Sequence, residues 1–317
     1  MLKKLVLGTR GSALALWQAR HVAAELRRAN PGLEVEESII KTEGDRNMKV
    51  LGATSARGVF VREIEEALLS GRIDLAVHSL KDLPTAQPDR LHLVAVSQRH
   101  DPRDAIMSPQ GFDLDTLPKG AVLGTGSFRR RTQLLNLRPD LIIRPIRGNL
   151  QTRIRKLGEK RYDALILALA GVQRLGMDEI PVQPIPEESC LPAVGQGILG
   201  LETRIDDPDA NTAVRVLEHG PTRKIVQAER SFLHHLGGGC LAPATGFATW
   251  AGNDLLVRAV VGDPEGRNLL RDQETGTPDT AEDIGRRLAE RMLQAGAARM
   301  LEQARQAAEE AEPPAPS

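Results

Sequence analysis

The chain contains one structural unit twice: a strand-like run that ends in a Gly-Thr turn and leads directly into a helical pattern. The first copy reads LGTRGSALAL from Leu7, and the second reads LGTGSFRRRTQL from Leu123. Other apolar runs alternate with helical patterns around both copies, which is the chain order of an open α/β sheet. The sequence therefore predicts an α/β protein with two lobes, each built around one copy of this unit.

The elements of the two lobes follow from hydrophobic periodicity. The first lobe has four strand-like runs and two helical patterns, at 5–9, 33–42, 73–80 and 91–96 and at 12–28 and 59–69. The second has strand-like runs at 121–126, 141–146 and 162–169, and its helices begin near Ser127 and Asn149. Segments 97–105 and 186–200 are predicted to cross between the lobes as a paired hinge, because the strand-like run ILGLETR then returns the chain to the first lobe.

A third unit is predicted to begin near Pro221. The run TRKIVQAERSFLHHL has apolar residues at helical spacing, and the runs GFATWAG and DLLVRAVVG follow it as an antiparallel hairpin. A long amphipathic helix from about Thr280 completes a small α+β domain, and the polar, proline-rich end is expected to be disordered. The predicted domains are 1–98 with 198–216, then 103–192 and 220–311, followed by a tail at 312–317.

Charge and cysteine content limit the partners and the compartment. The chain has 42 basic and 42 acidic residues, so no overall field would attract a nucleic acid or a membrane. The N-terminal apolar run breaks at Gly8 and Arg10, too early for a signal peptide or a membrane span, and a cytoplasmic protein is expected. The two cysteines, Cys190 and Cys240, argue against a disulfide framework, and Cys190 is expected to be packed.

Both Gly-Thr turns are candidate anion-binding sites. Helix N-termini have unpaired N–H groups and carry the positive end of the helix dipole. Hydroxyl and guanidinium groups reinforce the two turns: Arg10, Ser12, Thr125, Ser127, Arg129 and Arg130. The alternative for either turn alone is ordinary helix capping by serine. Recurrence at the same place in both lobes favours a shared anion-binding cleft.

Positive charge is concentrated between Ser127 and Arg161, where eleven basic residues stand against two acidic ones. A solvated face is the alternative interpretation. Arginine predominates over lysine, however, and its planar fork favours bidentate binding of carboxylate or phosphate. The turn GTGSFR lacks the third glycine of a dinucleotide-binding motif, and Arg144 and Arg147 follow where a ribose-binding acid is needed. No phosphate-loop sequence occurs either.

The segment HSLKDLP leaves the end of a predicted strand. Lys81 and Asp82 would therefore lie at the sheet edge where open α/β folds bind ligands. A solvent-exposed turn closed by Pro84 is the alternative.

The segment GGGCLAP places Cys240 behind three glycines, which would leave its thiol accessible unless they only cap a helix. A zinc site with His234 and His235 is not expected, because adjacent helical positions point in different directions.

Six motifs taken together resemble the porphobilinogen deaminases, also called hydroxymethylbilane synthases: GTRGSALALWQA, HSLKDLP, GTGSFRRRTQL, RGNLQTR, PAVGQG and LGGGCLAP. They occur in the order of that family, from residue 8 to residue 243. The resemblance implies two α/β lobes similar to type II periplasmic binding proteins plus a small C-terminal α+β domain. It also implies a transferase of porphyrin (haem) biosynthesis that uses no metal.

In this family the cysteine that matches Cys240 carries a dipyrromethane cofactor through a thioether. The resemblance thus gives the three glycines a purpose, because a bulky oligopyrrole must swing from one anchor. The implied reaction condenses four porphobilinogens stepwise with loss of ammonia, and hydrolysis then releases linear hydroxymethylbilane. Asp82 matches the catalytic aspartate, whose carboxylate would stabilise the positive charge of deamination and coupling.

Every pyrrole ring carries acetate and propionate, so the resemblance assigns cationic and polar residues to a polyanion. The implied cofactor-binding residues, besides Cys240, are Lys81, Ser12, Thr125, Ser127, Arg129, Arg130 and Arg147. The implied substrate-binding residues are Arg10, Arg147, Arg153, Arg174 and Gln196. The implied partners are porphobilinogen and uroporphyrinogen-III synthase, which receives the product, with neither nucleic acid nor membrane, and a monomer is expected.

The chain departs from the family pattern in two segments. Ala53 and Arg57 stand where many relatives have two lysines, and APATG after the cysteine replaces a more usual VPIG. A non-catalytic, two-lobed module that binds a small anion is the competing interpretation. Such a module has no use for Cys240 or Asp82.

Overall fold

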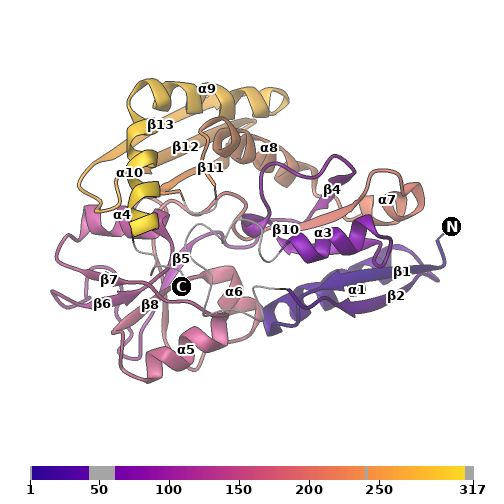
Figure 1. Cartoon of the computed structure of the whole chain (residues 1–317), viewed down its shortest axis with the longest axis horizontal. Helices are drawn as coiled ribbons and strands as arrows, with labels where there is room; N and C mark the ends of the chain where they lie inside the picture. The colour runs from indigo at the N-terminus through magenta and orange to yellow at the C-terminus, as the bar shows by residue number, and fades with distance from the viewer. Residues whose placement is uncertain (1, 43–60, 240–241, 311–317) are drawn as a thin grey trace, which may run out of the picture.

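The chain folds into three β-sheets with helices packed against them, in a computed structural model that describes residues 2–42, 61–239 and 242–310. Two five-stranded sheets occupy separate lobes, and a three-stranded sheet lies above the lobe that contains β5, β6 and β8 in Figure 1. The two-lobed α/β class with a small third domain is thereby confirmed. The predictions that concern Ala53, Arg57, Cys240 and the tail at 312–317 lie outside the described residues.

The first lobe comprises β1 (Lys4–Thr9), α1 (Ala13–Ala29), β2 (Glu34–Ile39), α3 (Arg62–Leu69), β3 (Leu75–Ser79), β4 (Leu91–Val96), β10 (Leu199–Arg204) and α7 (Pro208–Arg215). Its strand order is β2-β1-β3-β10-β4, with β1 parallel to both neighbours and β10 antiparallel. Leu5 and Leu7 of β1 are fully buried, and Val22 and Leu26 on the apolar face of α1 belong to the same core. This amphipathic pairing is what the sequence periodicity predicts.

The second lobe comprises β5 (Asp104–Met107), β6 (Val122–Gly124), α4 (Phe128–Leu137), β7 (Ile142–Arg144), α5 (Leu150–Gly158), β8 (Ala164–Ala168), α6 (Leu169–Arg174) and β9 (Val182–Pro184). Its order, β7-β6-β8-β5-β9, repeats the plan of the first sheet, because β6 has two parallel neighbours and β5 is the antiparallel strand beside β8. The sequence-based end of the first crossing segment is wrong. Asp104 and Ala105 already belong to β5, whose short apolar run gave too weak a signal.

The third unit is an antiparallel sheet, β11 (Ala244–Ala251), β12 (Asp254–Gly262) and β13 (Leu269–Gly276), with α8 (Gly220–His235), α9 (Ala281–Gln294) and α10 (Ala297–Glu310). The hairpin predicted between β11 and β12 is confirmed. The single long helix predicted from Thr280 is wrong. Gly296 adopts φ 103°, a left-handed conformation that ends α9 and lets α10 begin in a new direction (Figure 1).

The two crossing segments lie side by side between the lobes. The backbone N–H of His100 donates to the carbonyl of Gly197 at 3.2 Å, and Arg99 Nε donates to the carbonyl of Gln196 at 3.0 Å. Gly197 has φ 88°, and a Cβ there would stand 2.6 Å from the His100 carbonyl oxygen. Only glycine therefore allows the two segments to approach this closely.

Within the described parts of the chain, none of the helices combines the length and the apolar composition that crossing a membrane requires.

Candidate active site

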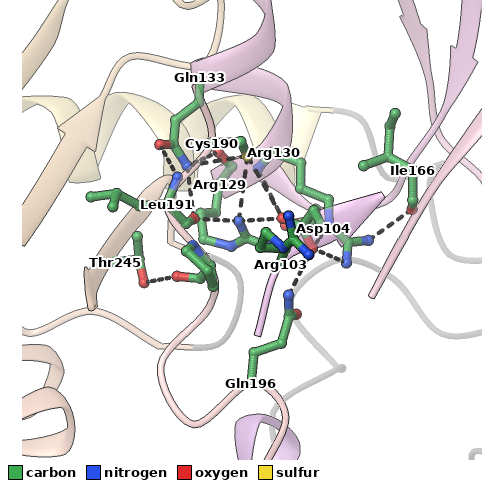
Figure 2. Close-up of polar contacts among 12 residues, drawn as sticks. Arg103, Asp104, Arg129, Arg130, Gln133, Ile166, Cys190, Leu191, Gln196 and Thr245 are labelled. Atoms are coloured by element: carbon green, nitrogen blue, oxygen red, sulfur yellow. Dashed lines mark hydrogen bonds and ion pairs between the residues drawn. The ribbon is translucent and has the colours of Figure 1, made fainter. Parts of the chain in front are cut away.

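The carboxylate of Asp104, at the start of β5, is the centre of a buried polar network (Figure 2). Its Oδ2 accepts from Arg129 Nη1 at 2.7 Å, and its Oδ1 accepts from Arg130 Nη2 at 2.7 Å and Nε at 3.0 Å. Burial alone would raise the pKa of Asp104, but the two guanidinium groups hold it well below its ordinary value. One anion thus faces two cations, and the cluster keeps one formal positive charge.

Arg129 and Arg130 lie in the first turn of α4, which Ser127 caps, and each is only 5% exposed. Arg129 Nη1 also donates to the Leu191 carbonyl at 2.6 Å, and Arg130 Nη1 donates to the Ile166 carbonyl at 2.9 Å. Both arginines that were predicted to bind anions therefore already donate hydrogen bonds to backbone carbonyls, in addition to their ion pairs with Asp104.

Lys81 lies on a short 3-10 helix, η1 (Leu80–Asp82), that directly follows β3. Its Nζ donates to Gln196 Oε1 at 3.3 Å, and Gln196 Nε2 donates to Asp104 Oδ1 at 2.8 Å. A chain of hydrogen bonds thus joins the end of the first lobe's β3 to the second lobe's β5.

The pKa of Lys81 is lowered to about 8. Burial is the main cause, and the charges of Arg130 and Arg129 lower it further, while Asp82 and Asp104 oppose the change. The amine therefore loses its charge within an accessible pH range, which a solvated lysine does not.

Asp82 ends η1 with an exposed side chain. Its charge acts on Lys81 and also on Arg153 of α5, whose Nε donates to the Gly148 carbonyl at 2.8 Å. The pKa of Arg153 is lowered to about 10, mainly by burial and in part by the charge of Arg130, while Asp82 opposes both effects. The structure thus brings one exposed carboxylate together with cationic groups from both lobes.

The predicted hydroxyl residues act as helix caps in the structure. Ser12 Oγ accepts from the Ala15 N–H at 3.4 Å, and Ser127 Oγ accepts from the Arg130 N–H at 3.4 Å. Thr125 is buried, and its Oγ1 accepts from the Ser127 N–H at 3.2 Å. A capping hydroxyl keeps its own hydrogen to donate, so capping and anion binding are compatible.

The remaining residues that were predicted to bind substrate or cofactor differ in their exposure to solvent. Arg147 is exposed, and Arg10 is half-buried after β1. Arg174, 8% exposed, donates from Nη2 to the Gly197 carbonyl at 2.8 Å and lies 5.8 Å from the ring centre of Trp17. Its Nε is buried without a hydrogen-bond partner among the described residues. Such an orphaned donor suits an additional acceptor.

The glycines before Cys240 end α8. Gly237 has φ 71°, its N–H donates to the His234 carbonyl, and the Gly238 N–H donates to the Leu233 carbonyl at 3.3 Å. This pattern is a Schellman cap. Cys240 itself lies beyond the described residues.

Cys190 is packed as predicted, with no exposed surface. Its Sγ lies 3.6 Å from Asp104 Oδ2, and burial raises the pKa of its thiol to about 12. Cys190 is therefore a poor nucleophile.

Sequence reasoning did not find Asp104 or the ion pair of Arg99 with Glu229. Arg99 Nη1 and Glu229 Oε1 are 2.7 Å apart, and this pair joins the crossing segment to α8. Asp104 and Glu229 both have charged neighbours in the sequence, and no feature of such a segment distinguishes a buried acidic residue from a solvent-exposed one.

Two family models match the chain. The dipyromethane cofactor binding domain of porphobilinogen deaminase matches residues 5–212, and the C-terminal domain of porphobilinogen deaminase matches residues 224–294.

Curated relatives match over nearly their whole length. Porphobilinogen deaminase of Syntrophus aciditrophicus (strain SB) is 48% identical over 297 residues, which are 93% of this chain and 97% of the relative. That of Desulforudis audaxviator (strain MP104C) is 47% identical over 306 residues, 96% of this chain and 99% of the relative. Among solved structures, an ancestral cationic amino acid solute binding protein is 15% identical with a TM-score of 0.43, covering 68% of this chain and 88% of its own.

The sequence motifs, the arrangement of two lobes and a third sheet, and the near-full-length relatives all agree. The chain belongs to the porphobilinogen deaminase family.

Proposed function

We propose that Asp82 and the cationic groups around it form the active site in which this chain joins porphobilinogen units. As a family member the chain is a transferase that condenses four porphobilinogens, with loss of ammonia, onto a dipyrromethane primer and releases linear hydroxymethylbilane. The observation that carries the site assignment is one exposed carboxylate, Asp82, whose charge acts on both Lys81 and Arg153, two groups on which Arg130 acts as well. A carboxylated oligopyrrole that develops positive charge needs both kinds of group.

The donor set fits the dipyrromethane cofactor, which the family attaches to the cysteine that matches Cys240. When bound, this group would supply the nucleophilic pyrrole carbon to which the first unit is joined, and each later unit would be joined to the terminal ring of the growing chain. Its carboxylates need several cations and hydroxyl donors, and the arginines at α4, Lys81 and the capping serines are of that type. The orphaned Nε of Arg174 adds one more donor for an anionic group.

Asp82 has the exposure that its proposed role requires. Its carboxylate can reach a substrate from η1, and a fixed negative charge stabilises a cation without rearranging in the reaction. The same carboxylate can hold or return a proton at Oδ during loss of ammonia. Arg153 and Lys81 in turn hold substrate carboxylates, and the charge of Asp82 favours their charged forms.

We propose three domains for this work, at 1–98 with 198–216, at 103–192 and at 220–311. The first would carry Asp82, the second the arginine cluster and the third the cofactor-bearing Cys240. The separate hydrophobic cores of the three sheets support this division.

Arg147→Leu is expected to raise the KM for porphobilinogen about tenfold and to accumulate partially extended enzyme-bound chains, because a charged hydrogen bond is lost. Arg147 is exposed and no side-chain contact ties it to the protein in the described residues, so the fold should not change. Steady-state kinetics and intact-mass spectra of the enzyme under substrate measure both effects.

Arg155→Leu is the matched control, because Arg155 is also an exposed arginine of the second lobe but forms an ion pair with Glu159. Wild-type kinetics are expected for it. If Arg147→Leu also kept a normal KM and a normal ladder of intermediates, Arg147 would only be a solvated side chain.

We further propose that the chain works as a cytoplasmic monomer and passes its product to uroporphyrinogen-III synthase. The buried, free thiol of Cys190 suits a reducing compartment. The exposed large hydrophobic residues belong to several different elements, as on an ordinary monomer surface. Light scattering of the purified protein, alone and with that synthase, should give a monomer mass, and a stable dimer would contradict the proposal.

A further inference from the structure

We propose that Asp104 is a positioning residue for the anion-binding groups on both sides of the active site. Its carboxylate fixes Arg129 and Arg130 directly. Through the amide of Gln196 it also fixes Lys81. The inference rests on the proposed function in assigning Lys81, Arg129 and Arg130 to the active site.

Asp104 itself cannot reach a substrate. Its side chain has no exposed surface, and both oxygens are used by donors of the protein (Figure 2). A buried carboxylate that accepts from several charged donors has one stable position. Its effect on the reaction must therefore pass through the residues that it holds.

The contacts of Arg130 within the protein leave some of its N–H groups free to donate to a ligand. Arg130 donates from both Nε and Nη2 to one oxygen of Asp104, Oδ1, and uses one Nη1 hydrogen on the Ile166 carbonyl. These bonds use three of the five N–H groups of a guanidinium. The pair fixes the plane of Arg130, while the remaining N–H groups and the excess positive charge stay available to an anion.

Gln196 transmits the position of Asp104 to Lys81. Its Nε2 has two hydrogens, and both are used, on Asp104 Oδ1 at 2.8 Å and on the Pro102 carbonyl at 2.6 Å. Both partners only accept, so a flipped amide would bring oxygen against two acceptors. The carboxylate thus forces Oε1 of Gln196 towards the amine of Lys81, 3.3 Å away.

The electrostatic effect of Asp104 on Lys81 also links these two residues. Among the residues that the structure describes, the charges of Asp82, Arg130, Asp104 and Arg129 act on Lys81. A nearby anion favours the charged form of an amine, so neutralising Asp104 leaves two arginines unbalanced and lowers the pKa of Lys81 below its present value of about 8. Loss of the Gln196 acceptor acts in the same direction, because that hydrogen bond stabilises the charged amine.

The test compares Asp104→Asn and Gln196→Met with the wild-type holoenzyme. Acetic anhydride labels only neutral amines, and peptide mass spectrometry reports the labelling rate of Lys81 at about pH 7. A pKa lowered by about one unit would make Lys81 react about fivefold faster in both variants. The exposed Lys119 is the internal control and should not change. The KM for porphobilinogen should also rise about tenfold in both variants.

The alternative is that Asp104 serves only the stability of the second lobe. In that case Asp104→Asn would lower the melting temperature, yet the folded protein would keep the wild-type labelling rate and KM, and the inference would be overturned. If Asp104→Asn does not fold, Gln196→Met decides alone, because it leaves Asp104 paired with both arginines.

The failure of the proposed function would look different. Lys81→Arg keeps a positive charge at every accessible pH, so its KM should lose the alkaline rise expected for the wild type above about pH 8. If the wild type has no such rise, Lys81 does not bind substrate. The labelling rates would still decide whether Asp104 positions it.

Discussion

Asp82→Asn, with its cofactor attached, is expected to turn over about 10²- to 10³-fold more slowly than the wild type, the usual loss when a preorganised electrostatic group is removed. The change keeps the size and hydrogen-bonding capacity of the side chain and removes only its charge. Lys81 and Arg153 would also lose an anion that favours the charged forms of both. Single-turnover kinetics per mole of loaded enzyme measures the effect.

Two controls make this result specific. Cofactor assembly uses the same chemistry, so loading must first be shown by intact mass, and circular dichroism must show an unchanged fold. Asp89→Asn is the matched variant, because Asp89 is exposed in the same connection between β3 and β4 and should keep wild-type turnover. A loaded Asp82→Asn enzyme within about threefold of the wild type would reduce Asp82 to a turn residue.

Periodicity and capping residues were sufficient to predict much of the fold. Ser12, Ser127 and Asn149 are the N-caps of α1, α4 and α5, as the sequence indicated. The errors arose where the local signal was weak: β5 is a short run behind a charged segment, and α9 and α10 share one amphipathic pattern that a single glycine divides. Periodicity cannot register such a break, because it depends on one backbone angle.

The active site shows a different limit. Lys81 and Asp82 could be predicted from their place at the end of a strand, because topology puts such residues at a ligand-binding edge. Asp104 could not, since its importance comes from three partners far away in the sequence, Arg129, Arg130 and Gln196. The arginines were assigned from charge alone. Sequence does not indicate that one carboxylate already holds both of them.

Cys240→Ser is expected to yield protein without the covalent dipyrromethane and with no detectable turnover. Thioether formation needs a thiol, whose thiolate is far more nucleophilic than a serine hydroxyl. Wild-type protein should exceed the mass of its chain by two porphobilinogens less two ammonias, on the peptide that contains Cys240. The cations around Lys81 and Arg130 would lack an anionic ligand in the variant, so its melting temperature should also fall.

Cys190→Ser is the control, because it removes the other thiol of the chain and leaves the proposed attachment point, Cys240, in place. Cys190 is fully buried, and its thiol has a pKa of about 12, so it cannot substitute for Cys240 as the attachment point. This variant should keep the added mass on the Cys240 peptide. An unmodified mass in fully active wild-type protein, or an adduct on the Cys190 peptide, would contradict the assignment. In either case the Schellman cap at Gly237 would explain the glycines by helix termination alone.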